Sequence, residues 1–460
     1  MIQDDISGLG ALLDAQRKAQ HSAGIPDLAT RRADLAQLKS ALKTRRADFI
    51  RAAAADFGQR SAEDTIILDL SGVVQGISYL HRHLHGWMRP ERVWPGIALW
   101  PGRARIIRQP KGVIGIMSPW NYPFGLSLLP VATAIAAGNR AMVKPSEFAP
   151  ASAALIAEVL SDLFGAEQVA VVQGGPEMGA AFASQPFDHL FYTGSTEIGR
   201  KVMQAAANNL VPVTLELGGK SPVILDVGAD LDKAARDIAF GKIANGGQTC
   251  IAPDYVLVPK ADLEQFTAAL VAALERGVRK VQITGIISQR HADRLRALAD
   301  EARSAGATVE GPGGGTDRVV MPAVIVGAGP DMRVMQEEIF GPLLPVLSYD
   351  RLEDAIRYVA ARPHPLALYY YGPNGPGRQA VLAGTRSGNV TINGAMTHYA
   401  VEALPFGGIG ASGMGAYHGR AGFDAMSHAR GIYTEPLRTP VGLGRPGGRF
   451  AAFFARYLMR

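Results

Sequence analysis

The sequence contains a single cysteine, Cys250, among its 460 residues. One cysteine excludes an intrachain disulfide framework, and it excludes zinc and iron–sulfur sites that are built from several cysteine ligands. The chain has no run of about 18 uncharged apolar residues, which argues against a membrane-spanning helix. Segment 1–20 is acidic before it is basic and contains no compact apolar stretch with a cleavage site, so it does not resemble a secretory signal. By default we expect a cytoplasmic protein without an integral membrane segment.

Charge of one sign is not concentrated in any part of the chain. The net charge is +6, which would fit an anionic partner, but the basic residues are scattered along the sequence. In the one dense basic run, 31–51, acids and apolar residues alternate with the bases at helical spacing. This pattern favours a solvated helix face over a nucleic-acid site, so we predict no nucleic-acid partner. The hydrophobic fraction of 47% excludes a mainly disordered chain.

A histidine-rich segment, HRHLH at 81–85, raises the alternative of a metal site. The segment continues a helical pattern, so only His81 and His85 share a face. No cysteine or acidic cluster accompanies them. We interpret the segment as an exposed polar helix end and predict no metal.

The hydrophobic pattern changes after the first 85 or so residues. The length predicts about three structural units. The first region has apolar spacings of three, four and seven, which predict helices. From Ile106 onward, short β-branched runs alternate with alanine-rich helical stretches, and a second such series extends from Leu231 to Asn393. This alternation predicts βαβ units and parallel sheets. The expected strands include 113–118, 141–144, 169–174, 189–194, 213–217, 222–226, 255–259, 323–327 and 344–349.

Two segments suggest contacts with another copy of the chain. Segment 98–112 has a Pro-Gly turn flanked by extended residues, which predicts a projecting hairpin. Such a hairpin needs a partner surface and therefore indicates oligomerisation. The C-terminal segment 449–460 is short, basic and aromatic, which favours packing onto an oligomer partner over contact with a membrane surface.

Three segments contain residues that could carry catalysis, each with a structural alternative. Cys250 follows Asn245, Gly246 and Gly247, which permit close approach of another group, yet taken alone it also fits a buried structural cysteine. Glu216 lies in an apolar strand, where a carboxylate is either a general base, a salt-bridge partner or solvent-facing. Asn121 lies between two prolines in PWNYP, which could aim its amide at an oxyanion or simply cap a helix.

Two further segments could bind a nucleotide. In FYTGSTEIGRKV, Gly194 and Gly199 have four residues between them, which is not the usual dinucleotide fingerprint. A Gly-Ser-Thr turn that opens a helix after a strand would still present N–H groups to a pyrophosphate. In AMVKPSE, Lys144 and Glu147 follow a strand and could hold the two hydroxyls of a ribose, or form a surface ion pair.

These signals occur together in one order along the chain. PWNYP, KPSE, FYTGSTEIG, LELGGK, GQTC, EEIFGP, NVTIN and PFGGIGASGMG together resemble the NAD(P)-dependent aldehyde dehydrogenase superfamily over roughly residues 105–425. The 34-residue spacing from Glu216 to Cys250 and the 129-residue spacing from Asn121 to Cys250 agree with that family. The short N-terminus and the segment 416–433 resemble its class-3-like branch, and within it the chain is similar to coniferyl aldehyde dehydrogenases.

The resemblance implies an α/β protein with two doubly wound domains. One is a Rossmann-like NAD(P)-binding domain over 1–215, which includes the projecting hairpin at about 98–112. The other is a catalytic domain over 216–395. Residues 396–460 are expected to return to the cofactor domain and to form an oligomerisation tail. A homodimer is the expected assembly.

The resemblance also implies a role for each motif. Cys250 would be the nucleophile, the Asn121 amide and the Cys250 backbone N–H the oxyanion hole, and Glu216 the general base that activates water on the thioester. The positions expected to bind the cofactor are Lys144 and Glu147 at the adenine ribose, Gly194, Ser195 and Gly199 at the pyrophosphate, Glu338 and Phe340 at the nicotinamide riboside, and Trp120.

The expected reaction is the irreversible oxidation of an aldehyde to its carboxylic acid. Glu147 would repel a 2′-phosphate, which favours NAD, although relatives with the same residue also accept NADP. The resemblance suggests an aromatic, coniferyl-type aldehyde, with medium-chain aliphatic aldehydes as the alternative. A CoA-acylating aldehyde dehydrogenase is the main competing interpretation, but such relatives usually lack the glutamate base. A cysteine hydrolase would need a histidine near Cys250, and a non-enzymatic protein would not need Cys250, Glu216 and Asn121 together.

Overall fold

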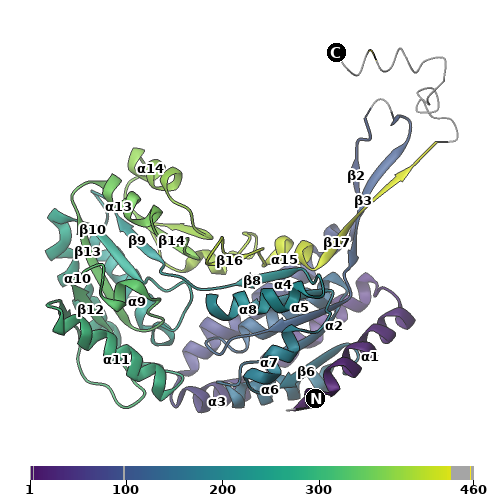
Figure 1. The fold of residues 1–460 in the computed structure, drawn as a ribbon, viewed down its shortest axis with the longest axis horizontal. Coiled ribbons are helices and arrows are strands. Elements are labelled where there is room, and N and C mark those ends of the chain that lie inside the picture. The colour runs from purple at the N-terminus through teal and green to yellow at the C-terminus, as the bar shows by residue number, and fades with distance from the viewer. Residues whose placement is uncertain (1, 4, 97–98, 437–455, 457–460) are drawn as a thin grey trace.

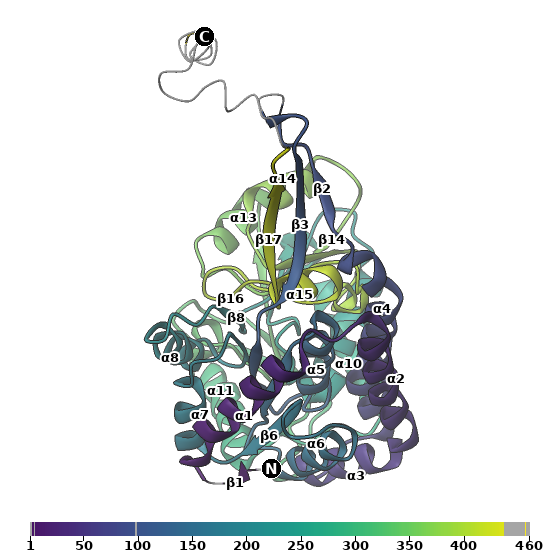
Figure 2. The same ribbon diagram turned by 90° about the vertical axis from the view of Figure 1, so that its right-hand side faces the viewer.

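The computed structural model describes residues 2–3, 5–96, 99–436 and 456. It has two lobes, each built around a sheet that is covered by helices (Figure 1). A small three-stranded sheet projects from the lobe that contains the N-terminal helices (Figures 1 and 2). In the part of the chain that the structure describes, no helix is both long enough and apolar enough to cross a membrane.

The N-terminal region is helical, as its hydrophobic spacing predicts. Leu35, Leu38 and Leu42 lie on one face of the second helix and are fully or almost fully buried. The carboxylate of Asp27 caps the start of this helix by accepting a hydrogen bond from the Thr30 backbone N–H at 2.8 Å. The region comprises β1 (Ile2–Gln3), α1 (Gly8–Ala23), α2 (Leu28–Thr44), α3 (Arg46–Phe57), the π-helical segment η1 (Asp64–Leu70) and α4 (Ser71–Met88).

The first large sheet has the strand order β1-β6-β5-β4-β7-β8-β16. Its strands run parallel except β16, which is antiparallel to β8. The chain winds from β4 outward in both directions, so the winding changes direction between β4 and β7. The strands are β4 (Val113–Met117), β5 (Arg140–Lys144), β6 (Val169–Gln173), β7 (His189–Thr193), β8 (Val213–Glu216) and β16 (Gly413–Met414), and the helices are α5 (Gly125–Ala137), α6 (Pro150–Leu163), α7 (Pro176–Ala183) and α8 (Thr196–Ala207).

The second large sheet has the order β11-β12-β13-β10-β9-β14-β15, parallel except for β11. Its strands are β9 (Pro222–Leu225), β10 (Tyr255–Pro259), β11 (Thr308–Glu310), β12 (Ala323–Val326), β13 (Leu343–Tyr349), β14 (Ala367–Tyr371) and β15 (Asn389–Ile392). The helical segments are α9 (Leu231–Ile243), η3 (Ala244–Gly247), η4 (Lys260–Asp262), α10 (Leu263–Val278), α11 (Gln289–Ser304), α12 (Arg333–Gln336), α13 (Leu352–Ala360), α14 (Pro376–Gly384) and η5 (Thr397–Ala400).

The predicted fold class, two doubly wound α/β units, is confirmed. The chain leaves the first sheet after β8, enters the second at β9 and returns to the first at β16. Each expected strand is present, because buried β-branched runs bounded by glycine, proline and polar turns favour strands. The boundaries at 215/216 and 395/396, and the functions assigned to the units, stay predictions.

The projecting sheet consists of β2 (Glu91–Val93), β3 (Arg103–Pro110) and β17 (Ser427–Thr434), in the order β17-β3-β2. The 98–112 range therefore contains one long strand, while the strand that pairs with it across the turn lies before that range. β3 pairs along its whole length with β17, which follows helix α15 (Gly419–Ala425). A sequence-distant partner of this kind leaves no local signal. Apart from Arg456, the C-terminal segment 449–460 lies outside the described residues.

Candidate active site

Cys250 lies in a half-buried turn that follows a strained loop. Asn245, Gly246 and Gly247 have consecutive φ values of 51°, 61° and 71°, a left-handed run that glycine tolerates far better than other residues. A Cβ on Gly246 would lie 2.8 Å from the Thr284 carbonyl oxygen, and one on Gly247 would overlap the Gly341 carbonyl. The glycines therefore let the loop pack tightly between two other segments of the second lobe and fix the position of the thiol.

Asn121, which follows β4, reaches the Cys250 loop from the first lobe. Its side-chain Nδ2 donates to the Gln248 backbone carbonyl oxygen at 3.0 Å. The backbone carbonyl oxygen of Asn121 accepts from Asn245 Nδ2 at 2.9 Å and from Arg60 Nη1 at 3.1 Å. A primary amide carries two N–H groups. Among the described residues, Nδ2 of Asn121 donates this one hydrogen bond, which leaves its second N–H without a partner.

Glu216 ends strand β8 and is 3% exposed. Within the described part of the chain, neither of its carboxylate oxygens has a hydrogen-bond partner. Burial raises the pKa of this carboxyl well above its usual value, because desolvation disfavours the charged form. An unpaired acid in such a site is costly for folding and is typical of a functional group.

The charge of the Glu216 carboxylate acts on the Cys250 thiol. Burial raises the pKa of Cys250 to about 12, and the negative charges of Glu338 and Glu216 add to this effect. The thiol is therefore protonated at neutral pH and needs a base before it can attack a carbonyl. The raised pKa of Glu216 gives that carboxylate a stronger affinity for a proton than an exposed glutamate has.

The cofactor candidates of the first lobe lie at the carboxyl ends of parallel strands. Lys144 ends β5 and donates from Nζ to Glu147 Oε2 at 3.0 Å. Ser195 caps α8 by accepting from the Ile198 backbone N–H at 3.4 Å. Burial raises the pKa of Tyr192 to about 12, hydrogen bonds with Ser195 lower it, and the charge of Glu147 raises it.

The two glycines of FYTGSTEIG have different structural roles. The Gly194 backbone N–H donates to the Glu216 carbonyl oxygen at 3.0 Å, so this donor belongs to the sheet and does not point to a ligand. A Cβ on Gly194 would overlap the Tyr192 hydroxyl. A Cβ on Gly199 would lie 2.6 Å from Leu217 Cδ2, so Gly199 lets α8 pack closely on the segment after β8.

The second lobe contributes Glu338 and Phe340 to the same region. The Phe340 ring meets the Trp120 ring edge-on, with centroids 5.3 Å apart, and thereby joins the two lobes. The Glu338 carboxylate lies directly against Gly218, where a Cβ would overlap it. Burial raises the pKa of Glu338 to about 8, and the charge of Asp254 raises it further.

A part-buried ion pair that sequence reasoning missed holds the Glu338 segment against the Cys250 segment. Lys220 forms an ion pair with Asp254 and also donates to the carbonyl oxygens of Val334 at 2.8 Å and Glu337 at 3.0 Å. Asp254 Oδ2 accepts from the Ile339 backbone N–H at 2.9 Å. The sequence signal that could have pointed to this ion pair is the charged residue at the end of each motif, Lys220 in LELGGK and Asp254 in GQTCIAPD.

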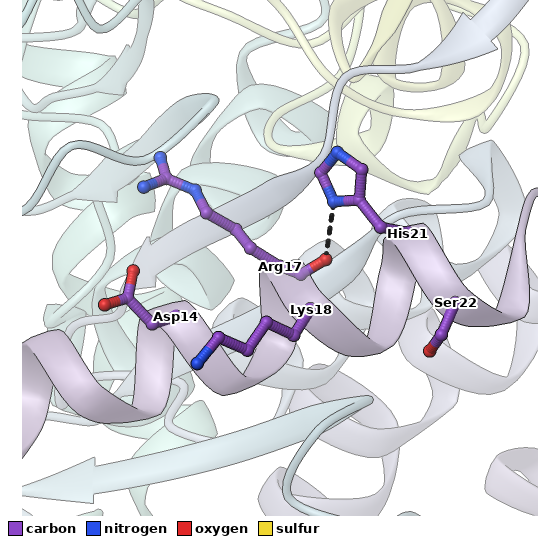
Figure 3. Close-up of a pocket in the computed structure, with 5 residues that line it drawn as sticks. All are labelled: Asp14, Arg17, Lys18, His21 and Ser22. Carbon is purple, nitrogen blue, oxygen red and sulfur yellow. Dashed lines mark hydrogen bonds between the residues drawn. The ribbon is translucent and has the colours of Figure 1, made fainter.

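Two surface hollows lie away from Cys250. One of about 540 Å³ is lined by residues of α1, most of them exposed, and none of the predicted site residues lines it (Figure 3). Another of about 390 Å³ lies at the start of α7, lined by Ile6 and residues 175–178. It is close to a candidate position, because a Cβ on Gly179 of the same helix would lie 3.5 Å from Lys144 Cε.

The two lobes thus bring together a thiol, an unpaired carboxyl and an amide at the carboxyl ends of the strands of the first sheet. A model of the family described as "Aldehyde dehydrogenase family" matches residues 9–432. This chain belongs to the aldehyde dehydrogenase family. The predicted resemblance is therefore confirmed, and the protein is an oxidoreductase.

Three curated relatives illustrate where this aldehyde dehydrogenase stands within its family. A protein of Pseudomonas aeruginosa named "Probable coniferyl aldehyde dehydrogenase" is 44% identical over 439 residues, which are 94% of this chain and 92% of the relative. The "Coniferyl aldehyde dehydrogenase" of a Pseudomonas species is 42% identical, over 94% and 92% of the two chains. The "Aldehyde dehydrogenase family 3 member A2" of Rattus norvegicus is 43% identical, over 72% and 69%.

Two solved structures resemble this aldehyde dehydrogenase in fold. The "Substrate bound state of Staphylococcus Aureus AldH" has a TM-score of 0.92 and 34% identity, with 97% of this chain and 99% of that chain covered. A Mycobacterium tuberculosis aldehyde dehydrogenase complexed with NAD+ has a TM-score of 0.86 and 28% identity, with 94% and 91% covered. These relatives do not favour the CoA-acylating alternative.

Proposed function

We propose that this aldehyde dehydrogenase oxidises coniferyl-type aromatic aldehydes to their carboxylic acids with NAD and water. The observation that best supports this proposal is the buried Glu216 carboxyl, which has no hydrogen-bond partner among the described residues and whose charge acts on the Cys250 thiol. A base next to a nucleophile serves both steps of such a reaction, since it can take the proton of the thiol and later that of a water molecule.

The first step is attack of the Cys250 sulfur on the aldehyde carbonyl carbon. Glu216 takes the thiol proton, the sulfur–carbon bond forms, and the carbonyl oxygen becomes an oxyanion. The free N–H of the Asn121 amide donates to this oxygen together with the Cys250 backbone N–H. The bond from Asn121 to the Gln248 carbonyl holds the amide at this position before substrate binds.

We expect two groups of residues to hold the adenosine and nicotinamide halves of NAD. Lys144 and Glu147 form an ion pair at the end of β5, next to the hollow at the start of α7, and would hold the adenine ribose. Glu338 and Phe340 would hold the nicotinamide riboside beside Trp120. When bound, NAD supplies the acceptor for the hydride that the thiohemiacetal carbon loses. Glu147 would repel a 2′-phosphate, so NAD is favoured while NADP is also accepted.

After hydride loss the acyl group is a thioester on Cys250. Glu216 releases the thiol proton to solvent and then takes a proton from a water molecule, whose oxygen attacks the thioester carbon. The Cys250 thiolate leaves and regains its proton from Glu216. Burial of Glu216 supports this role, because a desolvated carboxylate keeps a high affinity for the proton. The acid product, NADH and one proton are released.

The coniferyl-type substrate is supported by the names of the relatives and by tyrosines around Cys250. The Tyr122 hydroxyl is hydrogen-bonded to Thr249 Oγ1 at 2.7 Å, next to Cys250. Burial raises the pKa of both Tyr122 and Tyr399, and the charge of Cys250 adds a smaller contribution. The test is NADH formation by the purified protein with NAD and coniferyl, benzyl and aliphatic aldehydes, with and without CoA. CoA-independent turnover that is fastest on coniferyl aldehyde supports the proposal. A preference for aliphatic aldehydes would contradict the substrate, and strict CoA dependence would contradict the hydrolytic step.

The proposed assembly is a homodimer formed through the projecting sheet. β17 is an outer strand of that sheet and most of its residues are exposed. Trp94 and Trp100, in the turn between β2 and β3, are 68% and 57% exposed. An exposed strand edge with large aromatic residues is typical of an interaction surface. For location we propose the cytoplasm, because a catalytic thiol must stay reduced.

A further inference from the structure

Arg60 is a buried cation that takes no part in the proposed reaction steps. It lies between α3 and η1, and its side chain is not exposed at all. A guanidinium that leaves water needs partners for its charge and its N–H groups. Among the described residues, its one hydrogen bond runs from Nη1 to the backbone carbonyl oxygen of Asn121 at 3.1 Å, while Nε and Nη2 have no hydrogen-bond partner. The buried cation therefore spends its hydrogen bond on the residue that carries the proposed oxyanion donor.

Asp69, near the end of the π-helical segment η1, balances the charge of Arg60. Arg60 Nη2 lies 3.7 Å from Asp69 Oδ2, and both side chains are fully buried. The other oxygen of this carboxylate accepts a hydrogen bond from the backbone N–H of Gly125, the first residue of α5. A Cβ on Gly125 would lie 2.9 Å from Asp69 Oδ1, so glycine lets the carboxylate approach the start of this helix. Arg60 and Asp69 together thus hold both ends of segment 121–125.

Two aromatic rings enclose the same guanidinium. Arg60 Cζ lies 4.8 Å from the centroid of the Phe57 ring and 5.4 Å from that of Tyr122, within the range of cation–π interactions. Tyr122 belongs to segment 121–125, and its hydroxyl is hydrogen-bonded to Thr249, the residue before the nucleophile. Rings, carboxylate and carbonyl oxygen therefore fix Arg60 on several sides.

A second carboxylate of η1 holds the residue that Asn121 meets in the other lobe. Asp64 Oδ2 accepts from the Asn245 backbone N–H at 3.3 Å and from the Thr284 hydroxyl at 2.6 Å. Asn245 Nδ2 in turn donates to the Asn121 backbone carbonyl oxygen at 2.9 Å. This oxygen is therefore held from two sides, by Arg60 from the N-terminal region and by Asn245 from the second lobe.

We propose that Arg60 is a positioning residue that directs the Asn121 side-chain amide toward the oxyanion. The inference rests on the proposed function, because it takes Asn121 as a donor to that oxyanion. A carbonyl that is held from two sides fixes the planar peptide group after Asn121, and with it the direction in which the side chain leaves the backbone. Without Arg60, the carbonyl keeps only the bond from Asn245, so the segment is free to shift toward the second lobe.

The expected loss of rate comes from misplacement of the amide. A donor that is aimed in advance needs no reorganisation when negative charge forms, and a displacement of about 1 Å costs about a hundredfold in rate. Removing such a donor outright costs about 10²–10³-fold. We therefore expect Arg60→Met to slow thiol attack and hydride transfer roughly tenfold to a hundredfold, and Asn121→Ala to slow them at least as much.

The experiment measures the single-turnover rate of NADH formation, with enzyme in excess over aldehyde and with saturating NAD. This rate covers thiol attack and hydride transfer but not hydrolysis of the thioester. Coniferyl aldehyde and hexanal are both used, so that the result does not depend on which aldehyde the protein prefers. The variants are Arg60→Met, Asn121→Ala and the two combined.

Arg31→Met is the matched control. Arg31 is also a buried arginine, 4% exposed, and its Nη1 donates to the Ala136 carbonyl oxygen at 3.0 Å. It therefore holds the end of α5 that lies opposite Gly125. Thermal unfolding and calorimetric NAD binding check that each variant is folded. Loss of either arginine should lower the unfolding temperature, whereas only loss of Arg60 should slow NADH formation.

The combined variant separates positioning from a general structural effect. If Arg60 acts through the amide, Arg60→Met should cost little once the amide is gone, so the combined variant should lie within about twofold of Asn121→Ala. Arg60→Lys keeps the buried charge but offers a single point of contact in place of a planar fork, so an intermediate loss is expected. Arg60→Lys takes the place of Arg60→Met in the comparison if the methionine variant does not fold.

Other results would overturn the assignment, and they differ in what else they affect. If Arg60→Met matches the parent, if its loss multiplies that of Asn121→Ala in the combined variant, or if Arg31→Met slows NADH formation equally, Arg60 does not act through the amide, although the proposed function stands. If Asn121→Ala itself matches the parent, Asn121 is not the oxyanion donor, and that part of the proposed function falls together with the role of Arg60.

Discussion

Replacing Glu216 by glutamine tests the proposed mechanism most directly. The side chain is 3% exposed and neither oxygen has a partner among the described residues, so glutamine fits the same space and breaks no existing contact. It removes only the proton acceptor. A positioned general base contributes about 10²–10⁴-fold in rate, so hydrolysis of the thioester should slow by about that factor. Hydride transfer should slow less, because the partly exposed Cys250 thiol can also lose its proton to solvent before substrate binds, whereas the attacking water must be deprotonated at the thioester.

The assay is rapid-mixing measurement of NADH with enzyme at a concentration close to that of the product formed. We expect a burst of about one NADH per active site, followed by a slow steady state, and an acyl group on Cys250 that mass spectrometry detects. Unchanged steady-state turnover would refute the general-base role. A loss of rate without any burst would show that Glu216 acts before hydride transfer and not on the thioester.

The same variant has a consequence for stability whose sign follows from the raised pKa of Glu216. A carboxyl with a higher pKa in the folded state stabilises the fold below its unfolded value, 4.5, and this contribution is lost as the pH rises through the folded pKa. Glutamine does not titrate. The unfolding free energy of Glu216→Gln relative to the parent should therefore increase with pH, by about 1.4 kcal/mol for each unit by which folding raises the pKa. Parallel pH profiles from denaturant unfolding would contradict an uncompensated burial.

Three further predictions follow from other contacts. Cys250→Ala should abolish NADH formation and leave NAD binding intact in calorimetry; retained turnover would exclude Cys250 as the nucleophile. Asp254→Asn should lower kcat about tenfold to a hundredfold, because the Lys220 ion pair and the Ile339 N–H position the Glu338 segment; the exposed control Asp350→Asn should match the parent, and an equal loss in both would refute this. Trp94→Ser should weaken the dimer in light scattering at low concentration, whereas a parent protein that is monomeric contradicts the assembly.

The secondary structure was predictable because its signals are local. Runs such as VIGIM and YVLVP are buried on both faces of a parallel sheet, so they consist almost entirely of β-branched and other apolar residues. The spacing of Leu35, Leu38 and Leu42 likewise fixes a helix face. The projecting sheet was only partly predictable, because β3 takes its long partner β17 from more than 300 residues away in the chain.

The candidate site was predictable as a set of motifs, while the contacts that each residue makes in the folded protein were not. Gly194 was expected near a pyrophosphate, yet its N–H belongs to the sheet through the Glu216 carbonyl. The ion pair between Lys220 and Asp254 could not be predicted from the sequence, because a Lys and an Asp 34 residues apart carry no local sign that they pair.

The sequence by itself determined the family, the order of the elements and the identity of the candidate nucleophile, base and amide. These depend on residue types at fixed positions along the chain, and such patterns can be read without coordinates. The tertiary structure decided which charged groups interact electrostatically, which carboxylates are unpaired and which lobe supplies each part of the site. Burial, pKa and hydrogen bonding depend on neighbours that are distant in sequence, as with Glu216 and Cys250 at the meeting of the two lobes.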